Sequence, residues 1–174
     1  AKYILNYHTY KDYLKFAHDN NEKDCRWIYN IIDTNESTKL NKLLFSNENF
    51  VLVTENNMKN EDMSTFHLLA FPKDKTIRSI RDLKQDHISL LQEMSDTGKK
   101  YINDTYKINI NEIETHCHYP PGVMLLHIHF ELINNIKCRK PLREHAVSRI
   151  IENLKLDSDY YKKITMEFIQ KVNE

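Results

Sequence analysis

The stretch HCHYPPGVMLLHIHFELI, residues 116–133, decides the fold prediction. Its second half, MLLHIHFELI (124–133), is the strongest β-strand pattern in the chain, and INEIETHCHY (110–119) alternates well enough for another strand. The PPGV turn between them predicts that one strand folds back on the other. We therefore expect an antiparallel pair of strands in the middle of the fold.

Four of the nine histidines lie in this pair of strands. Residues two apart on a strand point to the same face, so His127 and His129 share a face, and His116 and His118 form a second such pair. If the turn centres near Pro121–Gly122, His116 lies opposite His127, whereas a slip of two residues brings His118 there instead. In either register, several imidazoles meet on the face opposite the apolar residues that alternate with them.

Three interpretations of this histidine cluster follow from the residues alone. The histidines could simply be solvated or lie at the edge of the core. They could bind a metal, since imidazole is a common zinc ligand, although Glu131 and Cys117 are the only obvious further ligands nearby. They could also act on phosphate, with one imidazole as nucleophile or general acid–base. The pattern leaves all three open.

The rest of the chain predicts an α+β domain with an antiparallel sheet, because strands cluster in the middle and helices precede, separate and follow them. Further strands are expected in KLLFSN (42–47), FVLVTE (50–55) and FHLLAFP (66–72), and the tail KKITMEFI (162–169) fits either a strand or a helix. Helices are expected near Tyr10–Ala17, Asn21–Asp33, Gln85–Tyr101 and Leu142–Leu154. We place a connecting segment at 1–20 and the domain at 21–174.

Composition excludes several classes of protein. The 174 residues suggest one domain, and a formal net charge of zero argues against bulk electrostatic binding of long nucleic acid. Two glycines are too few for glycine-rich phosphate loops. Three widely spaced cysteines (Cys25, Cys117 and Cys138) argue against a disulfide framework and favour a reducing compartment. The first 20 residues resemble neither a signal peptide nor a membrane span, so no membrane partner is expected.

Several motifs together resemble the scavenger mRNA decapping enzymes, a branch of the histidine-triad superfamily. LHIHF (126–130), with HYPP (118–121) starting nine residues before His127, resembles their histidine-triad signature. WIYNIID (27–33), FVLV (50–53), IRSIRDL (77–83) and REHAVSRIIENLKLDSDYY (143–161) resemble the same family in the same order. The resemblance covers residues 27–165, and the IRSIRDL and IIENL segments make it more specific than a generic histidine triad.

The resemblance implies a HIT-like α+β domain with a long central helix, which forms a homodimer. It implies hydrolysis of the 7-methylguanosine cap on short capped RNA through a nucleotidyl-histidine, with release of 7-methylguanosine monophosphate. No cofactor or metal is required, since an imidazole is the nucleophile. The location implied is the cytoplasm, with the nucleus as a second compartment.

The resemblance also assigns roles to single residues. His127 matches the attacking residue. Substrate contacts are implied at His118, His129, Trp27, Glu36 and Arg143: two phosphate contacts, a stacking platform for the cationic methylated base, an acceptor for guanine and a cation near the phosphates. Each of the last three also has a plain structural reading. Trp27 lies on the apolar face of its helix, Glu36 fits a solvated helix end, and Arg143 fits a surface cation.

Four departures from the family pattern stand out. Leu125 replaces the first triad histidine, so we expect the central imidazole to lose an orienting partner. Asn57 stands where the family has an active-site lysine, although Lys59 is two residues away; a lost phosphate-neutralising group costs the transition state about 3 kcal/mol. Gly122 and Val123 replace a serine and a tyrosine. Residues 1–20 resemble only the segment that connects to the family's N-terminal domain, which closes over the cap, so we expect these 174 residues to act without that domain or as part of a longer protein.

These departures keep two alternatives open beside a decapping hydrolase. One is a catalytically weak protein that binds caps or nucleotides, which the missing lysine and triad histidine favour. The other is a general nucleotide hydrolase of the histidine-triad superfamily, which the length of the match disfavours.

Overall fold

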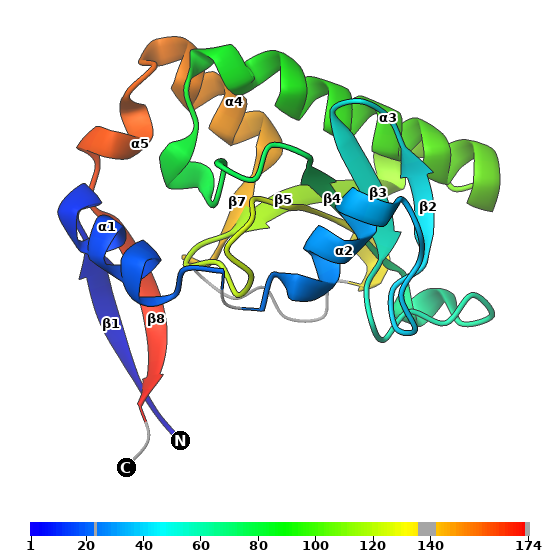
Figure 1. Ribbon diagram of the computed structural model, residues 1–174, viewed down its shortest axis with the longest axis horizontal. Helices are drawn as coiled ribbons and strands as arrows, with labels where there is room; N and C mark the ends of the chain where they lie inside the picture. Colours follow the sequence, from blue (N-terminus) through cyan, green and yellow to red (C-terminus); the bar gives the residue numbers. More distant parts are fainter. Residues whose placement is uncertain (23, 136–141, 173–174) are drawn as a thin grey trace.

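The computed structural model describes residues 1–22, 24–135 and 142–172. Its main layer is a six-stranded antiparallel sheet with the strand order β2-β3-β4-β6-β5-β7. The strands are β2 (Leu43–Ser46), β3 (Phe50–Thr54), β4 (His67–Pro72), β6 (Ile128–Leu132), β5 (Ile113–His118) and β7 (Glu144–Ala146). A second, two-stranded sheet pairs β1 (Lys2–His8) with β8 (Met166–Val172) and projects away from the main sheet (Figure 1).

Helices cover both faces of the main sheet. The long helix α3 (Ile88–Tyr106) contacts β4 and β6, and α4 (Val147–Leu156) contacts β5 and α3. The opposite face carries α2 (Arg26–Thr34), which is tied to β4 by an edge-to-face contact between Trp27 and Phe71. The smaller helices α1 (Tyr10–Asp19) and α5 (Tyr160–Lys163) lie between the main sheet and the β1–β8 arm (Figure 1).

Side-chain alternation along the central strands sorts residues between these two faces. Phe130 of β6 points to α3, where it meets Gly98 so closely that a Cβ there would lie 2.3 Å from the Phe130 ring. Only glycine permits this approach without a shift of the helix or the ring. Because alternate residues point to opposite faces, His129 lies on the face of the sheet away from α3. The close packing on one face thus holds the strand that carries histidine on the other.

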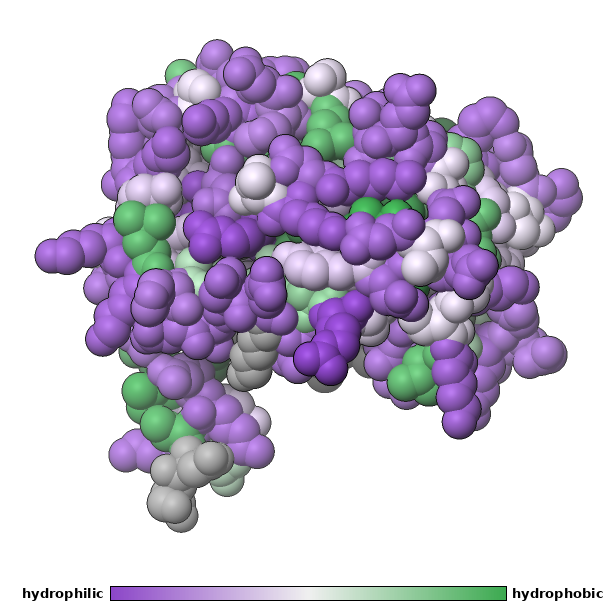
Figure 2. Space-filling view, in the orientation of Figure 1, coloured by the Kyte–Doolittle hydropathy of each residue, from purple (hydrophilic) through white to green (hydrophobic). Residues whose placement is uncertain are grey.

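The apolar side chains form one core under these layers. Strand β3 is buried along its whole length, as a strand covered on both faces should be. The side of the molecule drawn in Figure 2 is mostly hydrophilic, with small, scattered hydrophobic areas. The arm differs, because Tyr3, Leu5 and Tyr7 are about half exposed on β1. Cys25 and Cys117 are free and buried, whereas Cys138 lies outside the described residues.

The predicted strands are confirmed in part. KLLFSN, FVLVTE and FHLLAFP contain β2, β3 and β4, and the tail is a strand, β8, rather than a helix. The strand expected over 124–133 is shorter, since β6 begins at Ile128. Just before it, Leu126 donates its backbone N–H to the carbonyl of Ile77, outside any sheet ladder. The strand β1 was not predicted, because its exposed side chains give no alternating pattern of burial.

The predicted helices exist, but their ends differ. The helix expected from Asn21 begins at Arg26, because Glu22 and Asp24 have positive φ angles of 56° and 57° that a helix does not allow. The helix expected from Leu142 begins at Val147, since Leu142 also has a positive φ and residues 144–146 pair with β5 instead. The long helix follows a short 3₁₀ turn and runs five residues past the expected Tyr101, to Tyr106. The helix predicted at Tyr10–Ala17 is confirmed as α1.

Candidate active site

The sheet register brings five histidines together. His129 on β6 pairs with His116 on β5, and His67 on β4 reaches His129 from the other side, with its Nε2 2.8 Å from His129 Nδ1. The ring of His118 lies 4.0 Å from that of His129 and the ring of His127 lies 4.8 Å from it, centroid to centroid. The prediction that several imidazoles meet on one face is therefore confirmed.

The register is the second of the two alternatives raised by the sequence. The ladder pairs Ile113 with Leu132 and His116 with His129. The same register, continued by two residues, places His118 opposite His127, whereas the first alternative would have placed His116 there. On its other edge β5 pairs with β7, where His118 lies opposite Glu144. His67 was not singled out by sequence reasoning. The alternating pattern of FHLLAFP indicates which side of its own strand His67 occupies. The pairing of β4 with β6, which brings His67 close to His129, depends on the tertiary structure.

His127 lies just before β6 and has one nitrogen engaged. Its Nδ1 is 2.8 Å from the backbone carbonyl oxygen of Leu125, so Nδ1–H donates and Nε2 keeps its lone pair. The ring is 8% exposed and stacks on Phe71 with the centroids 4.8 Å apart. Leu125 itself is fully buried. A backbone carbonyl thus orients the imidazole whatever side chain residue 125 carries, and the expected loss of a further partner at this position stays a prediction.

Burial lowers the pKa of four of these imidazoles. Desolvation lowers the pKa of His127 to about 4, with the bond to the Leu125 carbonyl acting in the opposite direction. Desolvation also lowers the pKa of His67 to about 4 and, with the charge of Arg143, the pKa of His118 to about 2. The pKa of His129 falls well below its usual value for the same reason. Neutral rings at physiological pH offer lone pairs and single N–H donors rather than fixed positive charge.

Trp27 connects to this cluster through one aromatic neighbour. Its ring meets Phe71 edge to face at 5.5 Å, and Phe71 stacks on His127. Trp27 is half-buried and lines two cavities, one of about 530 Å³ with Asn30 and one of about 270 Å³ with Thr38 and other residues before β2. Trp27 is therefore neither a sealed core residue nor remote from the histidines.

The structure places the remaining candidates differently. Arg143 is half-buried, its carbonyl accepts the Tyr119 N–H at 2.9 Å, and its charge acts on His118 and His127. Glu36 is exposed just beyond α2, two residues before the segment that lines the smaller Trp27 cavity. Arg143 is thus brought to the cluster, whereas Glu36 has no contact with it among the described residues.

The other departures from the family pattern lie on exposed turns. Asn57 follows β3, and its backbone N–H donates to the Glu55 carboxylate, while Lys59 is exposed nearby. A Cβ added at Gly122 would meet nothing within 4 Å, so a serine there would fit without rearrangement. The replacement at Gly122 therefore has no packing cause in the described structure.

Two groups of side chains have the spacing needed to hold a metal. One consists of His116, His118 and His129, and the other of Glu114, His116 and Glu144; in each group the ligand atoms lie within 4.8 Å of one another. The two groups share His116. Within the described residues, no helix is both long enough and apolar enough to cross a membrane.

Comparison with known proteins agrees with these motifs. The chain is 27% identical to an m7GpppX diphosphatase of Rattus norvegicus over 154 residues, which are 86% of this chain and 45% of the relative. It is 29% identical to an m7GpppX diphosphatase of Caenorhabditis elegans over 156 residues, 85% of this chain and 49% of the relative. The chain therefore spans about half the length of the curated relatives it matches.

A crystal structure of the aprataxin ortholog Hnt3 in complex with DNA is also similar, with a TM-score of 0.49 and 16% identity over 76% of this chain and 78% of that one. The family model described as "Scavenger mRNA decapping enzyme C-term binding" matches residues 26–139. Because that match covers more than half of the chain, the protein belongs to this scavenger mRNA decapping family, and the predicted α+β, HIT-like fold class is confirmed.

Proposed function

We propose that this domain hydrolyses the 7-methylguanosine cap of short capped RNA or cap dinucleotides, with His127 as the nucleophile. One observation carries the proposal. The Nδ1 of His127 is held by the Leu125 carbonyl, so that its Nε2 is a neutral, unprotonated nitrogen within a group of neighbouring imidazoles. The family membership and the names of the relatives supply the substrate class.

In the first step, the His127 Nε2 lone pair attacks the phosphorus attached to 7-methylguanosine. The bond from that phosphorus to the bridging oxygen breaks, and the rest of the cap leaves as a nucleoside diphosphate that carries the electron pair. In the second step, water adds its oxygen to the phosphorus and gives up a proton, and the N–P bond breaks. The products are 7-methylguanosine monophosphate and a restored imidazole.

Neighbouring residues would hold the substrate. His118 and His129 flank His127 and are proposed to contact the phosphate oxygens. Arg143 supplies positive charge at the same place. Trp27 is proposed to stack on the methylated base, a cationic ring that favours an aromatic face, and its two cavities and its link to His127 through Phe71 support this. Glu36 is proposed as the guanine acceptor, since it lies two residues before Thr38, which lines the smaller cavity.

The test is incubation of the full chain with the methylated cap dinucleotide, followed by chromatography of the products. We expect 7-methylguanosine monophosphate from the parent chain and a loss of at least about 1,000-fold in His127→Asn, since the nucleophile is removed. His18→Asn is the matched control, because His18 is a highly exposed histidine on α1. Equal release by the parent and His127→Asn would refute the assigned nucleophile.

A degenerate cap-binding protein is the second candidate, and Asn57 in place of the family's lysine favours it. Saturable binding of the methylated dinucleotide without product would establish this alternative. Equal turnover of the unmethylated dinucleotide would instead indicate a general nucleotide hydrolase. The homodimer implied by the resemblance remains a prediction, which light scattering of the purified chain would test.

A further inference from the structure

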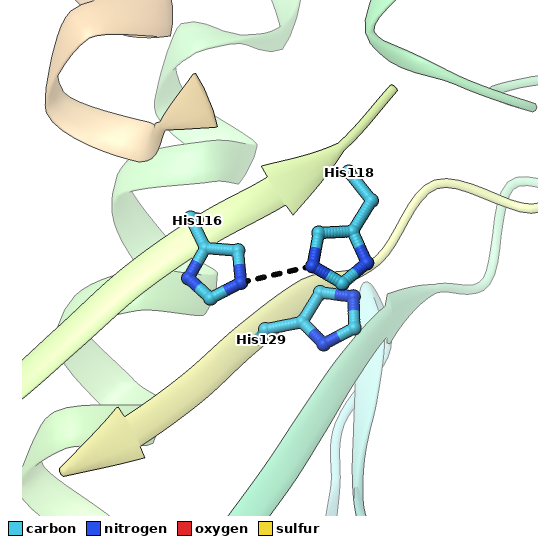
Figure 3. A group of neighbouring side chains, drawn as sticks. All are labelled: His116, His118 and His129. Atoms are coloured by element: carbon cyan, nitrogen blue, oxygen red, sulfur yellow. Dashed lines mark hydrogen bonds between the residues drawn. The ribbon is translucent and has the colours of Figure 1, made fainter. Parts of the chain in front are cut away.

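We propose that His116, His118 and His129 form a binding site for a divalent transition metal of the zinc class. Figure 3 shows the three rings as neighbours, His116 and His118 from β5 and His129 from β6. One nitrogen of each lies within 4.8 Å of the other two. The Nε2 atoms of His116 and His118 are 3.2 Å apart. Two nitrogens bound to one tetrahedral zinc ion lie about 3.3 Å apart, because each Zn–N bond is about 2.0–2.1 Å.

The third ligand is a buried nitrogen without a partner. His129 is 6% exposed, its Nδ1 is bonded to His67, and its Nε2 has no hydrogen-bond partner among the described residues. A buried polar atom left in this state destabilises the fold, and a ligand at Nε2 would remove that cost. The Nε2 atoms of His116 and His118 share one hydrogen bond, in which one neutral ring donates its N–H to the other, and a bound cation would take the place of that proton between them.

Side chains behind the three rings fit metal ligation as well. His116 Nδ1 lies 3.3 Å from a carboxylate oxygen of Glu114, and His67, which contacts His129, has its Nδ1 3.5 Å from Glu131. A carboxylate or imidazole that accepts the Nδ1 proton leaves the lone pair on Nε2, which is the usual support for a metal-binding histidine. His129 is therefore held with Nε2 as the available ligand atom, whereas His116 Nδ1 lies beside the Glu114 carboxylate but has no hydrogen-bond partner among the described residues.

The three-imidazole group is a better transition-metal site than the group with two carboxylates. Imidazole suits zinc, copper and nickel, whereas carboxylate oxygens suit magnesium, calcium and manganese. Three protein ligands also leave a fourth position open, as in catalytic rather than structural zinc sites. A metal here would occupy ring nitrogens of His118 and His129 that are proposed above to contact phosphate, so metal binding and those direct contacts exclude each other, and metal binding is tested apart from cap hydrolysis.

The experiment uses the full chain, without any affinity tag, first treated with a chelator that is then removed. Zinc chloride alone is titrated by calorimetry, and cobalt(II) alone is followed by visible absorption. We expect one zinc ion per chain with a dissociation constant in the micromolar range or below, and the intense cobalt spectrum of a site with fewer than six ligands.

Variants separate this site from unspecific binding. His118→Ala should weaken zinc binding at least 100-fold, and His67→Phe should weaken it about 10–100-fold through the supporting contact. His18→Ala and His87→Ala, which change histidines outside the cluster, should not alter it. No saturable binding by the parent chain, or the same affinity in His118→Ala, would overturn the proposal. Both readouts use metal alone, so their failure leaves the cap-hydrolysis proposal to its own assay.

Discussion

Arg81 and His129 are both polar side chains in the interior, but their surroundings differ. Arg81 is fully buried, and its guanidinium donates to the backbone carbonyls of Tyr161, Ile164 and His8. His129 is almost as buried, yet one of its two ring nitrogens has no partner in the described structure. The Arg81 site is complete without a ligand, whereas the histidine site is not.

This difference distinguishes a buried polar side chain that stabilises the fold from one that is available to bind a ligand. Arg81 belongs to IRSIRDL, one of the segments that make the family resemblance specific, and it joins the end of β1 to the segment around α5. A buried charge whose three guanidinium nitrogens are each hydrogen-bonded holds distant segments in one arrangement. Unpaired buried nitrogens cost stability and are retained where a ligand completes them. Three substitutions test this contrast.

The largest effect is expected from Arg81→Met. The variant keeps much of the side-chain volume but leaves three buried carbonyls without their donor, so we expect a loss of about 3–5 kcal/mol in the free energy of unfolding. Urea denaturation followed by circular dichroism measures it. Arg149→Met, at an exposed position on α4, is the control and should change stability by less than about 0.5 kcal/mol. Equal stability of the two variants would contradict the role given to Arg81.

An intermediate effect is expected from Gly98→Ala, which tests the packing behind the histidine-bearing strand. The added Cβ would lie 2.3 Å from the Phe130 ring, so the ring or α3 must shift. We expect a loss of about 1–3 kcal/mol, as for other overpacked cores. Gly122→Ala adds the same methyl group in open space and should be neutral or slightly stabilising. A thermal melt that ranks the two variants the other way would disprove the close contact.

The smallest effect on stability is expected from His129→Leu. Replacing a half-satisfied buried imidazole by an apolar side chain removes an unpaired nitrogen, so the free energy of unfolding should stay within about 1 kcal/mol of the parent. Phe130→Leu, the next residue on β6, loses packed volume and should cost about 1 kcal/mol or more. Denaturation of both variants checks this order. A loss of several kcal/mol in His129→Leu would make the histidine cluster structural, like Arg81.

Local patterns predicted much of the candidate site. The period of two in IETHCH and HIHF was enough to expect imidazoles meeting on one face, and the motif order was enough to single out His127, His118 and Arg143. The same patterns predicted a strand that begins before Ile128 and a helix that begins before Val147, and both were too long. For the helix, the positive φ of Leu142 and the pairing of β7 with β5 cannot be detected from hydrophobic periodicity.

Side-chain periodicity and short motifs depend on neighbours within a few positions, so the chain's residue order was sufficient for its α+β class, its central strands and its histidine cluster. Contacts between distant segments depend on register and layer packing. These added His67 to the cluster, placed Phe71 between Trp27 and His127, selected the register that pairs His116 with His129, and gave His127 a backbone carbonyl as its orienting partner. A backbone carbonyl does not change with the side chain, so Leu125 leaves this one contact of His127 in place.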